Sequence, residues 1–295
     1  EKAVRALTRA EIEGRVHRLE VDALGNLIAF KAGTGSEPRL KVLLAAHMDE
    51  VGFMITKIKK DGTLSFSASS VDARLLLAKR VQIGESGVPG VVCAPVPHLQ
   101  KGDSANRVLD ADDLFIDIGA ADYKSASAKV TLGDYATFAT SFRILSEDPA
   151  WPTVRGKAFD DRAGCAALVA LLTGAQEYPV DLYAAFTVQE EVGLRGARVV
   201  AHRVAPDAAF ALEGTICDDL PRPPDEDSTP VTRLGDGPAI TLMDRSLVAH
   251  PGLLALLRQT ADEAGLAVQY KAPGLGGTDA GAIHLAREGV PAVAV

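Results

Sequence analysis

The amino-acid sequence predicts an α/β protein whose mixed sheet is interrupted by a small inserted β domain. Helical and strand-like segments alternate along the chain after residue 150, which is typical of a sheet with helices on its faces. Residues 70–150 contain short β-like pieces between Gly and Pro residues, with few helical periods. Since 47% of the 295 residues are hydrophobic, the chain can form a large core.

The first part of the chain predicts one helix followed by a meander of strands. Apolar residues from Val4 to Leu19 have mostly helical spacing. Strand-like runs follow at 21–30, 41–46, 53–58 and 63–67, with turns at Gly25-Asn26 and Asp61-Gly62. We expect this meander to join the main sheet.

The last part of the chain predicts the alternating elements. Helices are expected at 162–176, 197–202, 251–264 and 280–287, and strands at 181–188, 207–212, 238–243, 266–270 and 290–295. We therefore expect a discontinuous α/β domain of residues 1–69 and 151–295. The inserted β domain is expected at 70–150.

Composition and charge argue against several classes of function. The formal net charge is -8 and no basic block offsets it, which argues against a nucleic-acid surface. The longest apolar runs fall short of the roughly 20 residues that a membrane-spanning helix needs, and the chain begins without a signal-like leader. Its 3 cysteines are widely spaced, which suits a reducing compartment. We expect a cytoplasmic protein that acts on peptides or small molecules.

Carboxylates and one imidazole stand beside the predicted strand ends. In chain order they are His47, Asp49, Asp160, Asp161, Glu190, Glu191 and Glu213. In open α/β sheets the loops at the carboxyl ends of strands converge, so these side chains are expected to meet. Because Arg162 is the only basic residue directly beside them, their charges would repel in a low dielectric unless a cation lies between them.

The residue types favour a metal site over separate structural roles. A strand-end histidine is often structural, an Asp-Asp pair often caps a helix, and a Glu-Glu pair is usually a solvated loop. Their joint placement at one predicted edge favours a shared site. Imidazole and carboxylates suit zinc, cobalt or manganese, and a bridging carboxylate suits two ions about 3.5–4 Å apart.

Several segments resemble a known family of enzymes. In chain order they are AAHMDEVGFMI, GKAFDDRAG, TVQEEVGLRGA, ALEGTICDDLP and GGTDAGAIH. Together they resemble the tetrahedral (TET) or glutamyl aminopeptidases, family forty-two of the metallopeptidases, some of whose members carry the name endoglucanase. The resemblance covers essentially the whole chain. It implies a di-metal aminopeptidase with an α/β catalytic domain and an inserted β-barrel domain that helps to assemble a dodecamer, although a dimer stays open.

The resemblance implies a role for each candidate ligand. His47 and Glu213 would hold one divalent ion, Glu191 would hold the second, and Asp160 would bridge both. The ions would be zinc or cobalt, with manganese as an alternative.

The resemblance also implies the catalytic residues. Glu190 would be the general base in removal of the N-terminal residue from peptides. Asp49 would orient the metal-bound His47. Thr278 and Asp279 are expected to shape the floor of the site.

One part of the family pattern is missing from the sequence as given. The family has a final histidine on the second metal just beyond the last strand, whereas this sequence stops at VPAVAV. His284 belongs to the GTDAGAIH motif and is not assigned as a ligand. We therefore expect missing residues at this end, and an incomplete second metal site in the chain as given. If the chain truly ended there, second-metal binding and activity would be weak.

Other functions stay open at this stage. The same metal centre could hydrolyse N-acylated amino acids, or the chain could be a non-catalytic peptide-binding subunit with a degenerate metal site. Glycan hydrolysis by paired carboxylates needs no histidine and is the least favoured. Release of free amino acids from unblocked peptides, abolished by a chelator, would separate an aminopeptidase from these alternatives.

Overall fold

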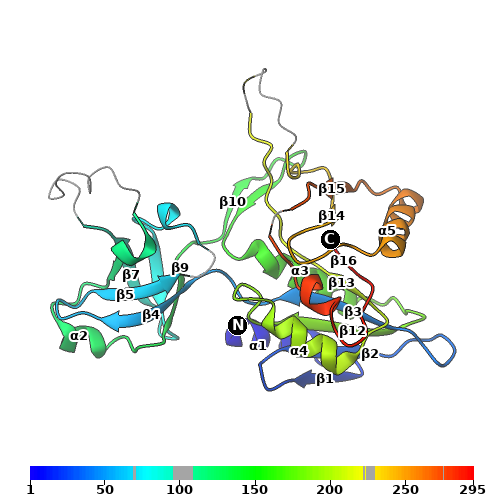
Figure 1. The fold of residues 1–295 in the computed structure, drawn as a ribbon, viewed down its shortest axis with the longest axis horizontal. Helices are drawn as coiled ribbons and strands as arrows, with labels where there is room; N and C mark the ends of the chain where they lie inside the picture. The colour runs from blue at the N-terminus through cyan, green and yellow to red at the C-terminus, as the bar shows by residue number, and fades with distance from the viewer. Residues whose placement is uncertain (69–70, 96–108, 222, 224–229, 275) are drawn as a thin grey trace. The chain divides into compact units, whose positions relative to one another are not determined.

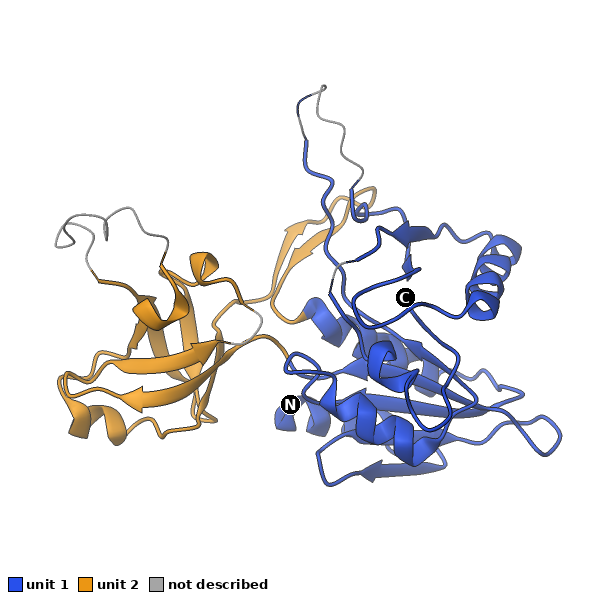
Figure 2. Cartoon of the chain, in the orientation of Figure 1, with its two compact units in different colours: residues 1–49, 159–295 blue, residues 50–158 orange. Residues whose placement is uncertain are grey.

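The computed structural model describes residues 1–295 except 69–70, 96–108, 222, 224–229 and 275. The chain divides into two compact units (Figure 2). Unit 1 comprises Glu1–Asp49 and Phe159–Val295, and unit 2 comprises Glu50–Ala158. The expected boundary at 69/70 falls on residues outside the described part. Within the described residues, no helix has both the length and the apolar character needed to span a membrane.

Unit 1 contains a six-stranded mixed sheet with the order β1-β2-β12-β3-β13-β16. The strands are β1 Arg18–Val21, β2 Leu27–Lys31, β3 Lys41–His47, β12 Asp181–Thr187, β13 Ala208–Ala211 and β16 Ala292–Ala294. The last four are parallel to one another, and β2 is antiparallel to β12. Because helices cover both faces, β3 and β12 have the near-continuous apolar sequences VLLAA and LYAAF.

The helices of unit 1 pack on opposite faces of this sheet (Figure 1). They are α1 Lys2–Ile12, α3 Phe159–Thr173, α4 Arg195–Val204, α5 Pro251–Ala264 and α6 Ala280–Ile283. One core contains Ile12, Leu168 and Phe186, where α1 and α3 pack on the sheet. The other contains Val200 and Ile283, where α4 and α6 pack. The parallel strands are therefore buried on both sides, and their carboxyl ends are free to carry a site.

Helix α5 has clear sequence signals at both ends. Pro251 occupies the first helical turn, where its missing N–H leaves no hydrogen bond unmade. Gly265 ends the helix with φ 65°, a left-handed conformation that glycine adopts easily. The neighbouring parallel strands β14 Ala239–Thr241 and β15 Gln269–Lys271 form a separate small sheet.

Unit 2 contains a closed barrel with the strand order β4-β5-β8-β7-β6-β9. The strands are β4 Phe53–Ile58, β5 Leu64–Ala68, β6 Arg80–Ile83, β7 Val88–Cys93, β8 Phe115–Asp117 and β9 Tyr135–Phe138. Helix α2 Tyr123–Ser127 and the 3₁₀ turns η1 Ala73–Leu75 and η4 Ala111–Asp113 connect them. The Phe53 ring packs edge-on against Phe66 and Phe138 in the core. Closure of the barrel leaves no long unpaired strand edge.

A two-stranded antiparallel ribbon also belongs to unit 2. It consists of β10 Arg143–Ser146 and β11 Thr153–Arg155, and it forms a sheet separate from the barrel. Among its strand residues only Ser146 and Thr153 are partly buried, and the others are exposed.

The structure confirms the predicted fold class, a mixed α/β sheet with a β barrel formed by an intervening stretch of the chain. The expectation that strands 53–58 and 63–67 join the main sheet is wrong. Both strands belong to the barrel, because their alternating apolar residues face its core. The opening helix is also shorter than its apolar spacing predicts: it ends at Ile12, and Leu19 lies in β1, paired with Ala29 of β2.

Candidate metal centre

His47 is the last residue of β3, and side chains of helix α3 hydrogen-bond to both its backbone N–H and its carbonyl oxygen. The N–H of His47 donates to Oδ2 of Asp161 at 3.0 Å, and the thiol of Cys165 donates to its carbonyl oxygen at 3.2 Å. Burial raises the pKa of the Cys165 thiol to about 12, so the thiol stays protonated and can donate. The imidazole is 1% exposed and is therefore fixed at the carboxyl edge of the sheet.

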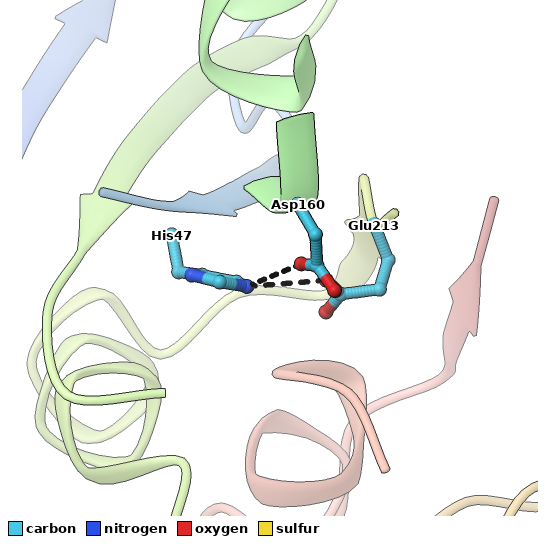
Figure 3. A group of neighbouring side chains, drawn as sticks. All are labelled: His47, Asp160 and Glu213. Atoms are coloured by element: carbon cyan, nitrogen blue, oxygen red, sulfur yellow. Dashed lines mark hydrogen bonds and ion pairs between the residues drawn. The ribbon is translucent and has the colours of Figure 1, made fainter. Parts of the chain in front are cut away.

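Two side chains from distant parts of the chain, those of Asp160 and Glu213, meet at the His47 imidazole (Figure 3). Nε2 lies 2.9 Å from Oδ1 of Asp160, at the start of α3, and 3.2 Å from Oε1 of Glu213, which follows β13. One ligand atom from each of the three residues lies within 4.8 Å of the others. The sequence-based prediction that these three residues meet agrees with this arrangement.

The pKa shifts of His47 and Glu213 are those expected at a cation-binding site. Burial raises the pKa of Glu213 well above its ordinary value, and its Oε2 is buried with no hydrogen-bond partner among the described residues. Burial opposes protonation of His47, but the carboxylates of Asp160, Asp49 and Glu213 outweigh it and raise the pKa of the imidazole well above 6.5. Imidazole plus carboxylates is a donor set for zinc, cobalt or manganese. The residues present therefore fit a divalent ion.

Asp49 connects His47 to the loop that carries the glutamate pair. Its Oδ1 lies 3.5 Å from Nδ1 of His47, a long contact, while its two oxygens accept the N–H groups of Glu190 and Glu191 at 3.1 Å each. Burial raises the pKa of Asp49, but contact with His47 and these two backbone donors lower it more, so the net shift is downward. Asp49 therefore stays ionised and faces the imidazole.

Glu190 lies inside the site, close to His47. Oε2 of Glu190 is 4.0 Å from Nε2 of His47, and the side chain is 10% exposed. Burial, with smaller contributions from Asp279, Glu191 and Asp49, raises the pKa of Glu190 to about 8 against the opposing effect of His47. Glu191 follows it on the same loop but is not one of the three residues that converge on a single point.

The loop after β12 is held by Asn26, which the sequence marks only as a turn residue. The Asn26 side chain accepts the Val188 N–H at 3.0 Å and donates to the Gly196 carbonyl at 3.2 Å. A Cβ at Gly196 would lie 2.3 Å from Oδ1 of Asn26, so only glycine fits there. This contact fixes both ends of the segment that carries Glu190.

Asp161 and Glu50 are acids to which the sequence assigns no role. Asp161 has a pKa raised to about 7 by burial, and it accepts hydrogen bonds from the backbone N–H groups of His47 and Gly164. The Asp-Asp pair before a helix is the only sequence signal for it. Glu50, in unit 2, accepts two hydrogen bonds from Nζ of Lys157, at 2.6 and 2.9 Å.

The GTDA motif, residues 277–280, contributes buried polar side chains next to the end of β12. Thr278 and Asp279 are 1% and 2% exposed. Oδ2 of Asp279 lies 2.5 Å from the hydroxyl of Thr187, the last residue of β12, and burial raises the pKa of Asp279 to about 6. Oδ1 of Asp279 and Oγ1 of Thr278 have no partner among the described residues.

Comparison with known proteins identifies a family that this chain matches. Residues 25–295 match the family described as M42 glutamyl aminopeptidase. The glutamyl aminopeptidase of Lactococcus lactis subsp. cremoris is 33% identical over 311 residues, which cover 100% of this chain and 82% of the relative.

Solved structures share the fold closely. A TET aminopeptidase from a marine-sediment Thaumarchaeota archaeon has a TM-score of 0.89 and 35% identity, covering 99% of this chain and 82% of its own. The TET1 peptidase of Pyrococcus horikoshii, which can assemble into a tetrahedron or a large octahedral shell, has a TM-score of 0.82 and 33% identity, covering 100% of this chain and 85% of its own.

Proposed function

The chain belongs to the M42 glutamyl aminopeptidase family and is a metal-dependent aminopeptidase, and from this premise we propose the roles of its site residues. His47 and Glu213 would hold one divalent ion, Glu191 would hold a second, and Asp160 would be shared between them. The contacts of His47 with Asp160 and Glu213, at 2.9 and 3.2 Å, carry this assignment for the first ion. For Glu191 the support is its position on the loop held by Asp49.

The proposed ions are zinc or cobalt, with manganese as the alternative, because the donors are one imidazole and carboxylates without a thiolate. When bound, such ions lower the pKa of water and polarise a peptide carbonyl. Oε2 of Glu213 is buried and has no hydrogen-bond partner in the described part of the chain, which supports a cation beside it.

Glu190 is the proposed general base. It lies within the site at 4.0 Å from His47, and burial raises the pKa of its carboxyl to about 8, close to the neutral range in which a group can both accept and release a proton. It would take the proton of the attacking water and pass it to the leaving amine. Asp49 would hold the His47 ring and the Glu190 backbone in fixed positions, because it contacts each of them separately.

The substrate is a peptide with a free amino terminus. The carboxylates around His47 outnumber the cationic side chains there, which favours binding of a protonated amine beside the scissile bond. This would restrict cleavage to the first residue.

The inserted barrel unit is proposed to serve in self-assembly, into a dimer or a dodecamer. The support is the P. horikoshii relative, which can assemble into a tetrahedron or a large octahedral shell. A cytoplasmic location is proposed because Cys93, Cys165 and Cys217 are all free thiols.

The function is tested by an aminopeptidase assay across a panel of amino-acid amides, with metal content measured on the same sample. We expect release of free amino acids, loss of activity with a chelator and recovery with zinc, cobalt or manganese. N-acetylated amides should not be cleaved. Hydrolysis of the acetylated panel but not of the free amides would contradict the proposal and favour a deacylase.

A further inference from the structure

Unit 2 has a basic hollow on its surface that is lined by no residue of the metal centre. The hollow has a volume of about 250 Å³ and lies where the chain passes from the barrel to the ribbon. Its polar lining consists of Lys79, Arg80, Thr140, Ser141, Arg143 and Arg155. No carboxylate is among its lining residues.

The ribbon places two arginines on one face. Arg143 and Arg155 are register partners in the antiparallel β10–β11 pair, so their side chains point to the same side. The next pair, Ile144 and Val154, points to the opposite side and is 57% and 45% exposed. Like charges directly across a strand pair destabilise it. The ribbon therefore carries a like-charge pair that an anion would neutralise.

The four cationic side chains of the hollow have no ion-pair partner in the described part of the chain. Arg74 and Lys157, two other cations of unit 2, are paired: Arg74 contacts Asp72 at 2.5 Å, and Lys157 contacts Glu50 at 2.6 Å. The whole chain has a formal net charge of -8, so an unpaired basic group of this size is a local feature and not a consequence of composition.

We infer that this hollow binds a phosphate group, either as the free anion or carried on a small organic molecule. A guanidinium matches a phosphate with two parallel hydrogen bonds, and the pair of arginines can bind from one face. The hydroxyls of Thr140 and Ser141 can donate to further phosphate oxygens. The volume would hold on the order of eight waters, which is enough for a phosphate and a small attached group.

The test is calorimetric titration of the metal-loaded full chain with inorganic phosphate and, separately, with glycerol phosphate. Phosphate can also bind at a metal centre. The quantities compared are therefore the number and affinity of phosphate sites in wild type and in the double variant Arg143→Ala/Arg155→Ala. We expect the variant to lose one binding site, with affinity at that site reduced roughly tenfold or more because two charge-assisted contacts are removed. Tighter binding of inorganic phosphate would identify the free anion as ligand, and tighter binding of glycerol phosphate would identify the carried group.

A charge-matched control is Arg9→Ala/Arg258→Ala, which removes two arginines from helices of unit 1. It should bind as wild type does. Identical isotherms for wild type and the Arg143/Arg155 variant, or equal losses in both double variants, would overturn the inference.

A second measurement covers the case in which the ribbon is disturbed by substitution. Without phosphate, Arg155→Ala should melt no lower than wild type, because one member of the like-charge pair is gone. Phosphate should raise the melting temperature of wild type but not of Arg155→Ala, since a ligand stabilises only the protein that binds it. An equal rise in both proteins would also overturn the inference.

Discussion

The hydroxyl of Thr187 and the carboxyl of Asp279 lie 2.5 Å apart beneath the metal centre. Thr187 is the register partner of His47 in the β12–β3 pair, and its hydroxyl also lies 3.3 Å from the carbonyl oxygen of Ala46. One buried contact therefore joins the GTDA motif to both strands that deliver the proposed site residues.

We expect Asp279→Ala to lower kcat by roughly tenfold to a hundredfold while KM changes little. Removal of the carboxyl leaves the buried Thr187 hydroxyl short of a partner, at a cost of about 1–3 kcal/mol in stability, and loosens the ends of β3 and β12. Steady-state kinetics on an amino-acid amide and thermal unfolding are the measurements.

Asp279→Asn is the matched variant, because an amide can still bond to Thr187, and it should recover much of kcat. Asp262→Ala, at an exposed position on α5, is the control for a general effect of removing an acid. Wild-type kcat in Asp279→Ala would contradict a positioning role.

Glu190→Gln should retain bound metal and lose turnover by a factor of about 10²–10⁴, the usual contribution of a general base. Glutamine keeps the size of the side chain and leaves the backbone N–H free to donate to Asp49. Metal analysis and kcat are measured on one sample, with the exposed Glu177→Gln as control. Retention of more than a few per cent of wild-type turnover would remove Glu190 from the role of base.

The metal-free protein should lose stability as the pH rises from about 5 to 8. Burial raises the folded-state pKa of Glu190 to about 8, of Asp161 to about 7 and of Asp279 to about 6, whereas their ordinary values are 4.5, 3.8 and 3.8. In this range the folded protein holds protons that the unfolded chain has released. Since the folded state binds more protons, stability falls with rising pH, by about 1.4 kcal/mol per pH unit for each group still protonated. The raised pKa of His47 acts in the same direction above 6.5.

Thermal unfolding of chelator-treated protein between pH 5 and 8 checks this expectation, with metal-loaded protein as the comparison. Bound cations stabilise the ionised carboxylates, so the loaded protein should show a much weaker pH dependence over this range. A metal-free protein that becomes more stable as the pH rises would show that these carboxyls are not held protonated in the fold.

The sequence predicts the site better than it predicts the arrangement of the strands. His47 ends β3 and Glu213 follows β13, so both lie at one edge, because the parallel strands of a sheet end at the same edge. Asp160 is indicated instead by its place just before a predicted helix. Such a local sequence pattern does not show which strands pair with one another. The strands Phe53–Ile58 and Leu64–Ala68 have the same alternation whether they extend a sheet or close a barrel.

Backbone contacts at the site were also beyond sequence reasoning. The thiol of Cys165 donates to the His47 carbonyl, and Asp161 accepts the His47 N–H. Both contacts depend on where the first turn of α3 meets the end of β3. That distance follows from packing of the helix on the sheet and has no signature in residue spacing.

Gly214→Ala should weaken metal binding without unfolding the protein. Gly214 follows Glu213, and a Cβ placed on it would lie 2.7 Å from Cβ, 2.9 Å from Cα and 2.9 Å from Cγ of Asp160. These distances are shorter than carbon atoms tolerate, and two of the three atoms belong to the inner, inflexible part of Asp160. The carboxylate of Asp160 must therefore move away from His47, and we expect at least a tenfold loss of metal affinity in a competition titration, because ligand geometry governs affinity. Gly174→Ala is the matched control: its Cβ would come no closer than 3.3 Å to a neighbouring atom. Circular dichroism should be unchanged for both variants, and unchanged metal affinity in Gly214→Ala would show that the position of Asp160 relative to His47 does not control binding.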